Sequence, residues 1–171
     1  MENRTCAIIS ESPMCFAWGF DEEDPVCSAL RLLLLNRISL FQTQGITQFA
    51  VSVDSGIGLF AAEAINSLRE TSPDLELICH IPYERQAVKW SPELRDRYYE
   101  ALYKCTSSSL TSPEKTPTCD VDTMLNAIDQ SETVIAVCAG EEFQDKAFAT
   151  ALRYAERTGR PITIIKPLKL A

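Results

Sequence analysis

The sequence has little of what several protein classes require: it contains a single histidine, six glycines and no long apolar run. Apolar stretches such as residues 32–35 are far shorter than the roughly 20 residues of a membrane-spanning helix. Residues 1–10 contain no long apolar segment after Arg4, which argues against a secretory signal. We therefore expect a cytoplasmic protein that makes no contact with a membrane.

Positive charge is also scarce, because 16 Lys and Arg residues stand against 24 Asp and Glu residues, for a net charge of −8. Non-specific binding to nucleic acid or to anionic lipid depends on clustered Lys and Arg. We expect neither partner. A small phosphate-bearing ligand stays compatible with this charge, since backbone N–H groups can bind it.

Cysteine and histidine are not spaced as metal ligands. The seven cysteines include no C-x-x-C pair, and Cys6, Cys79 and Cys138 lie inside apolar runs. With His80 as the sole histidine, no metal site is expected. Reduced, mostly buried thiols in a cytosolic protein fit the pattern better.

The catalytic residue types form no recognisable set. His80 lies within an apolar segment and is expected to be a core or edge histidine with its hydrogen bonds satisfied, rather than a general base. The acidic run 22–24 is expected to be a solvated face at a helix N-terminus, and Glu141 and Glu142 also precede a helical segment. Because no nucleophile, base and orienting group can be assembled, we expect no catalytic residues.

What the sequence does contain is typical of one globular domain. Its 171 residues, 46% apolar and 23% charged, are enough to bury a core and exclude disordered or collagen-like chains. No internal repeat or boundary is visible. We therefore expect a single domain spanning residues 1–171.

Short β-rich segments alternate with longer helical ones, which predicts parallel strands joined by crossover helices. Strands are expected at 6–10, 49–53, 75–81, 133–138 and 162–166, and helices at 25–44, 56–70, from about 91, 121–130 and 143–158. The Ser-, Thr- and Pro-rich segment 105–118 predicts a surface loop, with a short strand as an open alternative. The predicted fold is an α/β Rossmann-like three-layer sandwich: a mostly parallel central sheet with helices on both faces.

The first predicted helix has clear ends. Asp24 before Pro25 is typical of an N-cap followed by proline in the first turn, and Gly45 is typical of a helix end. Its inward stripe is expected to consist of Val26, Leu30, Leu33, Leu34, Ile38 and Phe41.

Ligands of open parallel sheets bind beyond the carboxyl ends of the strands. Four loops are expected at this edge: residues 10–13, 54–58, 82–90 and 139–144. The candidate ligand-binding residues from these loops are Ser10, Asp54, Ser55, Gly56, Gly58, Gln86, Trp90 and Gly140.

The turn Asp54-Ser55-Gly56-Ile57-Gly58 leads from a strand directly into a helix. Its glycines would let a phosphate approach the backbone, and the helix N-terminus would supply N–H groups. A tight turn without a ligand explains the same pattern equally well. Asp54 is equally an acceptor for ribose hydroxyls or the N-cap of the helix. The match to G-x-G-x-x-G is incomplete and does not support a dinucleotide site.

The loop P-Y-E-R-Q-A-V-K-W carries Tyr83, Gln86 and Trp90, which could stack on a base and bond to its edge. Alternatively, Trp90 covers the edge of the sheet and Gln86 ties the loop to the backbone. Phe16 and Trp18, in the long loop after the first strand, leave the same choice open.

Three segments carry a family resemblance: G-I-G-L-F-A-A-E, ending at Glu63, then residues 82–90, and D-Q-S at 129–131 before the apolar segment 134–138. They resemble the YpsA-like family of small bacterial proteins, a branch of the SLOG superfamily. That superfamily also contains DprA-type DNA-processing proteins and the LOG phosphoribohydrolases. The resemblance covers nearly the whole chain.

The resemblance implies a Rossmann-like fold with a site for a nucleotide or a nucleotide-derived, ADP-ribose-like ligand. It places Gly56 in the phosphate-binding turn and Pro13 after the first strand. It also assigns Gln86 and Trp90 to the ligand loop and Thr150 to the late helix.

The chain departs from the family pattern at several positions. Ser10, Val53 and Ala149 stand where the family tends to have glycine. Their side chains narrow the space in which a ligand could approach the backbone. Ser12 replaces a basic residue, and Gly58 replaces a glutamate. The LOG motif P-G-G-x-G-T-x-x-E is missing at C-A-G-E-E-F, so phosphoribohydrolase activity is not implied.

Three functions are compatible with these observations. The first is binding or sensing of a nucleotide-derived ligand without catalysis. The second is hydrolysis of nucleoside monophosphates or ADP-ribose-like substrates, with Asp54 or Glu141 as the carboxylate. The third is a regulatory interaction module with a decayed site, using the loops at 22–24 and 105–118. A homodimer is compatible with a domain of this size, although no exposed apolar stripe specifies one.

Overall fold

The structure is a computed structural model and describes residues 2–168. In this range the strands are β1 (Thr5–Ser10), β2 (Gln48–Ser52), β3 (Glu76–Tyr83), β4 (Ser107–Ser112), β5 (Thr133–Val137) and β6 (Ile162–Ile165). The α-helices are α1 (Pro25–Thr43), α2 (Ile57–Arg69), α3 (Pro92–Lys104), α4 (Cys119–Asp129) and α5 (Lys146–Arg157), with a short 3₁₀ turn at Pro13–Cys15.

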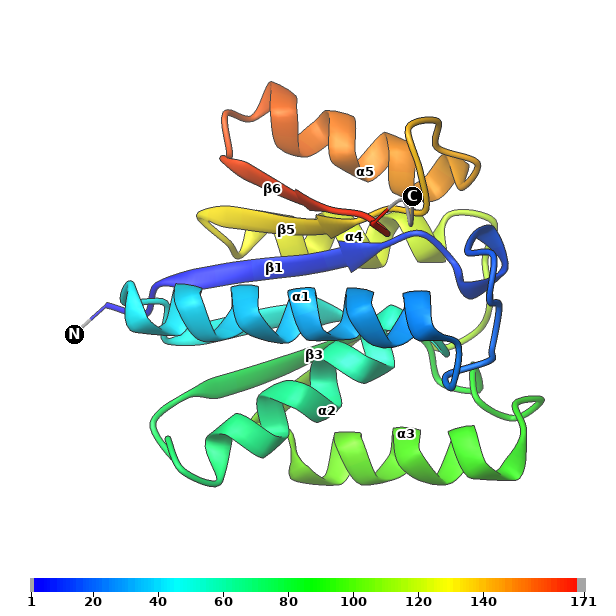
Figure 1. Cartoon of the computed structure of the whole chain (residues 1–171), viewed down its shortest axis with the longest axis horizontal. Coiled ribbons are helices and arrows are strands. Elements are labelled where there is room, and N and C mark those ends of the chain that lie inside the picture. The colour runs from blue at the N-terminus through cyan, green and yellow to red at the C-terminus, as the bar shows by residue number, and fades with distance from the viewer. Residues whose placement is uncertain (1, 169–171) are drawn as a thin grey trace.

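All described strands belong to one sheet of order β4-β3-β2-β1-β5-β6, and every neighbouring pair is parallel. Helices α1, α2 and α3 cover one face, while α4 and α5 cover the other (Figure 1). The predicted Rossmann-like three-layer fold is confirmed. Its sheet is fully parallel over the described residues.

The strands are nearly continuous apolar runs because both faces of the sheet are covered. Alternate residues enter different cores: Ile8 and Val51 face α1 and α2, whereas Ala7 and Ala50 face the α4 and α5 side. Small side chains such as Ala136 on the second side allow close approach of the helices. The two-residue period of a strand therefore explains both cores.

Helix α1 begins and ends where the sequence predicts. The Asp24 carboxylate accepts hydrogen bonds from the backbone N–H groups of Val26 and Cys27, at 2.8 and 3.2 Å. Gly45 ends the helix with a φ of +103°.

The predicted inward stripe of α1 is wrong at Leu33, which is 36% exposed. The buried side of the helix is formed by Cys27, Leu30, Leu34 and Ile38. Because this helix is apolar on more than one side, its leucines alone do not reveal which side faces the sheet.

The segment 105–118 contains β4, the edge strand beside β3. The short-strand alternative for this segment is therefore correct. The late helix begins at Lys146 rather than near residue 143, because the Asp145 carboxylate accepts a hydrogen bond from the backbone N–H of Phe148 and caps the helix.

The chain order creates a topological switch point between β1 and β5. From β1 the chain proceeds outward through β2, β3 and β4, and α4 then returns it to β5 beside β1. Ligands of open α/β sheets bind where neighbouring strands send their connections in opposite directions. Within the described range, no helix is both long and apolar enough to cross a bilayer.

Candidate functional site

A cavity of about 230 Å³ opens at the carboxyl edge of the sheet. It is formed by the loops after β1, β2 and β3, together with the first turns of α4 and α5. The predicted residues that line it together are Ser10, Pro13, Asp54, Ser55, Gln86 and Trp90. Three of the four loops expected at this edge therefore line the cavity, whereas residues 139–144 do not.

Asp54 caps a helix, which is one of the two roles that the sequence left open for it. Its Oδ1 accepts hydrogen bonds from the backbone N–H groups of Gly56 and Gly58, at 2.9 and 3.0 Å, and so caps α2. The same side chain also lines the cavity. Burial, helped by the negative charges of Asp145 and Asp120, raises the pKa of Asp54 to about 6 despite these two hydrogen bonds.

The two glycines of this turn allow the protein to pack closely against itself. A Cβ atom at Gly58 would lie 2.3 Å from the carbonyl oxygen of Ser52, so α2 could not approach the end of β2. A Cβ at Gly56 would lie 2.6 Å from Cγ of Pro13. The Pro13 ring therefore fills the space beside Gly56.

Two acidic residues that the sequence did not single out occupy the switch point. Glu11 is fully buried, and its Oε1 accepts a hydrogen bond from the backbone N–H of Ala139 at 3.1 Å. Its Oε2 accepts from the N–H groups of Gln144 and Asp145, at 3.3 and 3.4 Å. The loop between β5 and α5 is thus held by a carboxylate that directly follows β1.

Asp145 ties the same two loops together from the other side. Its carboxylate accepts from the backbone N–H of Ser12 at 3.0 Å as well as from that of Phe148 at 3.2 Å. In the sequence, Glu11 is seen only as an acidic residue after an apolar strand, and Asp145 only as an acidic residue before a helix. Neither signal tells which loop the carboxylate will bind.

In the loop after β3, Gln86 ties the loop to the backbone, as one of its two expected roles requires, and both Gln86 and Trp90 line the cavity. Gln86 Nε2 donates to the carbonyl oxygen of Val53 at 3.1 Å and to the Tyr98 hydroxyl at 3.2 Å. Trp90 packs edge-on against Tyr98, with ring centroids 5.0 Å apart. These contacts hold one face of the cavity in place.

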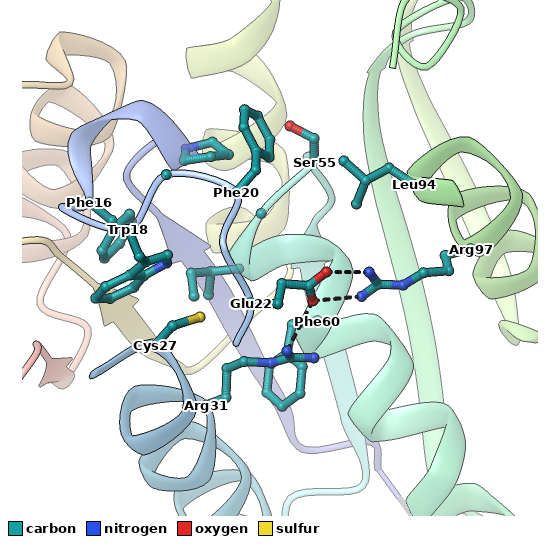
Figure 2. Close-up of a pocket in the computed structure, with 14 residues that line it drawn as sticks. Phe16, Trp18, Phe20, Glu22, Cys27, Arg31, Ser55, Phe60, Leu94 and Arg97 are labelled. Carbon is teal, nitrogen blue, oxygen red and sulfur yellow. Dashed lines mark hydrogen bonds and ion pairs between the residues drawn. The ribbon is translucent and has the colours of Figure 1, made fainter. Parts of the chain in front are cut away.

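A second, smaller hollow lies beside the cavity and shares Pro13 and Ser55 with it. Its volume of about 30 Å³ has room for about one water molecule. Phe16 stacks on Trp18 at its wall, with ring centroids 4.9 Å apart (Figure 2). Phe16 is buried in the core and Trp18 packs against it, whereas Phe20 of the same loop is 52% exposed.

The acidic run at 22–24 is not simply a solvated face. Figure 2 shows the Glu22 carboxylate between two arginines: it pairs with Arg31 at 2.9 Å and accepts from Arg97 Nη2 at 3.0 Å. Arg97 also donates to Glu63 of α2 at 2.7 Å. Hydrogen bonds from Arg97 lower the pKa of Glu22. This network fixes the long loop after β1, and with it Pro13, against α1, α2 and α3.

Other predicted residues lie away from the cavity. Gly58 is covered by β2, and neither Gly140 nor Thr150 lines the cavity; Thr150 is exposed on α5. Glu141 is exposed and pairs with Lys166, also outside it.

His80 is a core histidine, as the sequence predicts. Its Nε2 lies 2.6 Å from Gln130 Oε1, and burial lowers its pKa. Its Nδ1 is buried without a hydrogen-bond partner, so the expectation that both ring nitrogens are satisfied is wrong. In the part of the chain that the structure describes, no group of three or more His, Cys, Asp or Glu residues could hold a metal ion.

The fully parallel sheet and the cavity beside its switch point define a Rossmann-like α/β protein with a candidate small-molecule site at the strand ends. A family model described as the YspA SLOG family (YpsA) matches residues 14–170. The chain belongs to this family, which confirms the resemblance seen in its motifs.

Individual relatives agree with this assignment. The chain is 26% identical over 150 residues to UPF0398 protein YpsA of Bacillus subtilis, covering 85% of this chain and 83% of that protein. It is 30% identical over 83 residues to a UPF0398 protein of Bacillus licheniformis, covering 48% and 45%. Their names state no ligand or activity.

Proposed function

We propose that this protein binds or senses a small nucleotide-derived ligand in the cavity at the carboxyl edge of the sheet, without catalysing its turnover. The observation that carries the proposal is the convergence of three strand-end loops and two helix starts on one cavity. Such cavities are the usual ligand sites of open parallel sheets.

The lining fits a sugar and a base. Hydroxyl groups of Ser10, Ser12 and Ser55 and the carboxylates of Asp54 and Asp120 can bond to ribose hydroxyls, while the indole of Trp90 offers an apolar face. Typical ligand cavities measure about 300–1,000 Å³, and this one measures about 230 Å³. The ligand is therefore compact, of nucleoside rather than dinucleotide size.

The lining also favours binding over catalysis. It contains neither histidine nor cysteine among the described residues. Two of its carboxylates, Asp54 and Asp145, already cap α2 and α5. A carboxylate held by backbone N–H groups positions the fold rather than a reacting water molecule.

Trp90→Leu tests the proposal in calorimetric titrations with the four common ribonucleosides, their 5′-monophosphates and ADP-ribose. Base stacking on an aromatic residue contributes about 1–3 kcal/mol. We expect at least one of these compounds to bind wild type and to bind the variant about ten-fold or more weakly. Tyr103→Leu is the matched control, because Tyr103 lies on α3 and is 90% exposed.

No binding by any compound at millimolar concentration would refute the proposal. Equal binding by Trp90→Leu and wild type would place the ligand elsewhere.

A second candidate function is hydrolysis of a glycosidic bond in nucleoside monophosphates or ADP-ribose-like substrates. It is supported by Asp54, a cavity carboxyl whose pKa is raised to about 6 and which can therefore exchange a proton near neutral pH. Chromatography of the same mixtures would detect a released base. A base released by wild type and not by Asp54→Asn would favour this function over simple binding.

A further inference from the structure

We propose that the cavity selects an unphosphorylated, nucleoside-type ligand, because the protein's own carboxylates and Pro13 occupy the places where a phosphate would bind. This inference rests on the proposed function and specifies its ligand class. It differs from what the glycine turn suggests in isolation, which is a phosphate site.

The first place is the N-terminus of α2. Phosphates in Rossmann-like folds bind to the free N–H groups of such a helix start. Here the N–H groups of Gly56 and Gly58 both donate to Asp54 Oδ1. The Pro13 ring lies against Gly56 so closely that even a Cβ atom there would be 2.6 Å from its Cγ. A phosphate would have to displace both groups.

The second place is the switch point between β1 and β5. Three backbone N–H groups of the β5–α5 loop converge there, and all three donate to the fully buried Glu11 carboxylate. A phosphate would need the same donors. Glu11 cannot make room for it, because a displaced carboxylate would stay buried without hydrogen bonds, at a high desolvation cost.

The third place is the start of α5, where Asp145 takes the hydrogen bonds that an anion would receive. Its carboxylate accepts from the N–H groups of Ser12 and Phe148. Asp145 lines the cavity itself, so its negative charge faces any ligand inside.

The charges of the lining act in the same direction. Asp54, Asp120 and Asp145 line the cavity, against Lys115 as the single basic residue among the described lining residues. A phosphate monoester carries about −1.5 to −2 charges at pH 7 and would be repelled. Ribose hydroxyls and base amino groups are hydrogen-bond donors, which carboxylates accept favourably. The site therefore matches a nucleoside better than its phosphate.

The experiment compares each ribonucleoside with its own 5′-monophosphate by calorimetry on the wild-type protein, and adds inorganic phosphate in a thermal unfolding assay. We expect the bound nucleoside to bind at least ten-fold more tightly than its monophosphate. We also expect 10 mM phosphate to leave the wild-type Tm unchanged within about one degree. A monophosphate that binds as tightly as the nucleoside, or a wild-type Tm raised by phosphate, would overturn the inference while leaving the proposed function intact.

A variant arm keeps the inference testable even if no nucleoside binds and the proposed function fails. Asp145→Ala frees two backbone N–H groups and removes one negative charge from the cavity. We expect phosphate to raise the Tm of this variant by several degrees more than that of wild type. Glu84→Ala is the control, because Glu84 is an exposed acidic residue outside the lining. Equal phosphate responses of Asp145→Ala and wild type would count against exclusion by the carboxylates.

Discussion

Gly58 lies at the closest approach between α2 and the end of β2. A Cβ atom there would meet the carbonyl oxygen of Ser52 at 2.3 Å, so Gly58→Ala must push the helix away from the sheet. We expect a loss of about 1–3 kcal/mol in the free energy of unfolding, measured by urea denaturation.

Gly140→Ala is the matched control for this substitution, since a Cβ at Gly140 meets no atom within 4 Å. It should change stability by less than about 0.5 kcal/mol. Equal effects of the two substitutions would show that α2 does not pack as described.

Asp54 makes a specific contribution to the pH dependence of stability. Its pKa is raised from 3.8 to about 6 in the folded protein, so the folded state holds the proton more tightly than the unfolded state. The contribution of Asp54 to stability is therefore largest below about pH 4 and is lost as the pH rises through about 6.

The difference in unfolding free energy between wild type and Asp54→Asn, measured by urea denaturation from about pH 4 to pH 7, isolates this effect. As the pH rises over that range, wild type should lose about 1–3 kcal/mol of unfolding free energy relative to Asp54→Asn. Asparagine retains an oxygen that can cap α2, which makes it the appropriate substitution. Two parallel stability curves would contradict the assigned environment of Asp54.

The sequence predicted the roles of residues whose hydrogen-bond partners are close to them in the chain. Asp24 followed by Pro25 specified the cap of α1, because the donors lie two and three residues further along. The roles of Glu11 and Asp145 could not be predicted in this way. The backbone groups that Glu11 binds lie as far as 134 residues along the chain, and only the folded sheet brings them together.

The long loop between β1 and α1 contributes Ser12 and Pro13 to the cavity, and Glu22 holds this loop through Arg31 and Arg97. Glu22→Gln removes the negative charge of Glu22 from this network, while Arg97 keeps its ion pair with Glu63. We expect a loss of about 1–2 kcal/mol in stability and faster amide hydrogen exchange in residues 11–24.

Glu23→Gln provides the comparison for this element. Glu23 is the exposed neighbour of Glu22, so its substitution removes the same charge at a position outside the Arg31 and Arg97 network. It should leave the exchange of the loop unchanged. Equal exchange in the Glu22 and Glu23 variants would mean that the ion pairs do not fix the loop.

The elements themselves were largely predictable, and the exceptions have physical reasons. Strands buried on both faces, such as β1 and β5, appear as short apolar runs with helical segments between them. By contrast, β4 is an edge strand of sequence S-S-S-L-T-S with mostly exposed side chains, so it carries no apolar pattern. The orientation of α1 was misjudged at Leu33, because a helix that is apolar on several sides does not reveal its buried face.

At the scale of the whole molecule, the strand order decides where a ligand can bind. It places β1 beside β5 and brings the loops after β1, β2 and β3 around one cavity. That these loops meet could be predicted from the alternation of strands and helices. The acidic character of the place where they meet could not, because it depends on which side chains turn inward after folding.

Native mass spectrometry of freshly purified protein tests the central claim most directly, with released molecules identified under denaturing conditions. Protein without a bound ligand is then incubated with the ribonucleosides, their 5′-monophosphates and ADP-ribose, and measured again. We predict a single nucleoside-sized adduct per chain, present on purification or formed on incubation, and depleted in Trp90→Leu. A clean ligand-free mass under both conditions would contradict the proposed function.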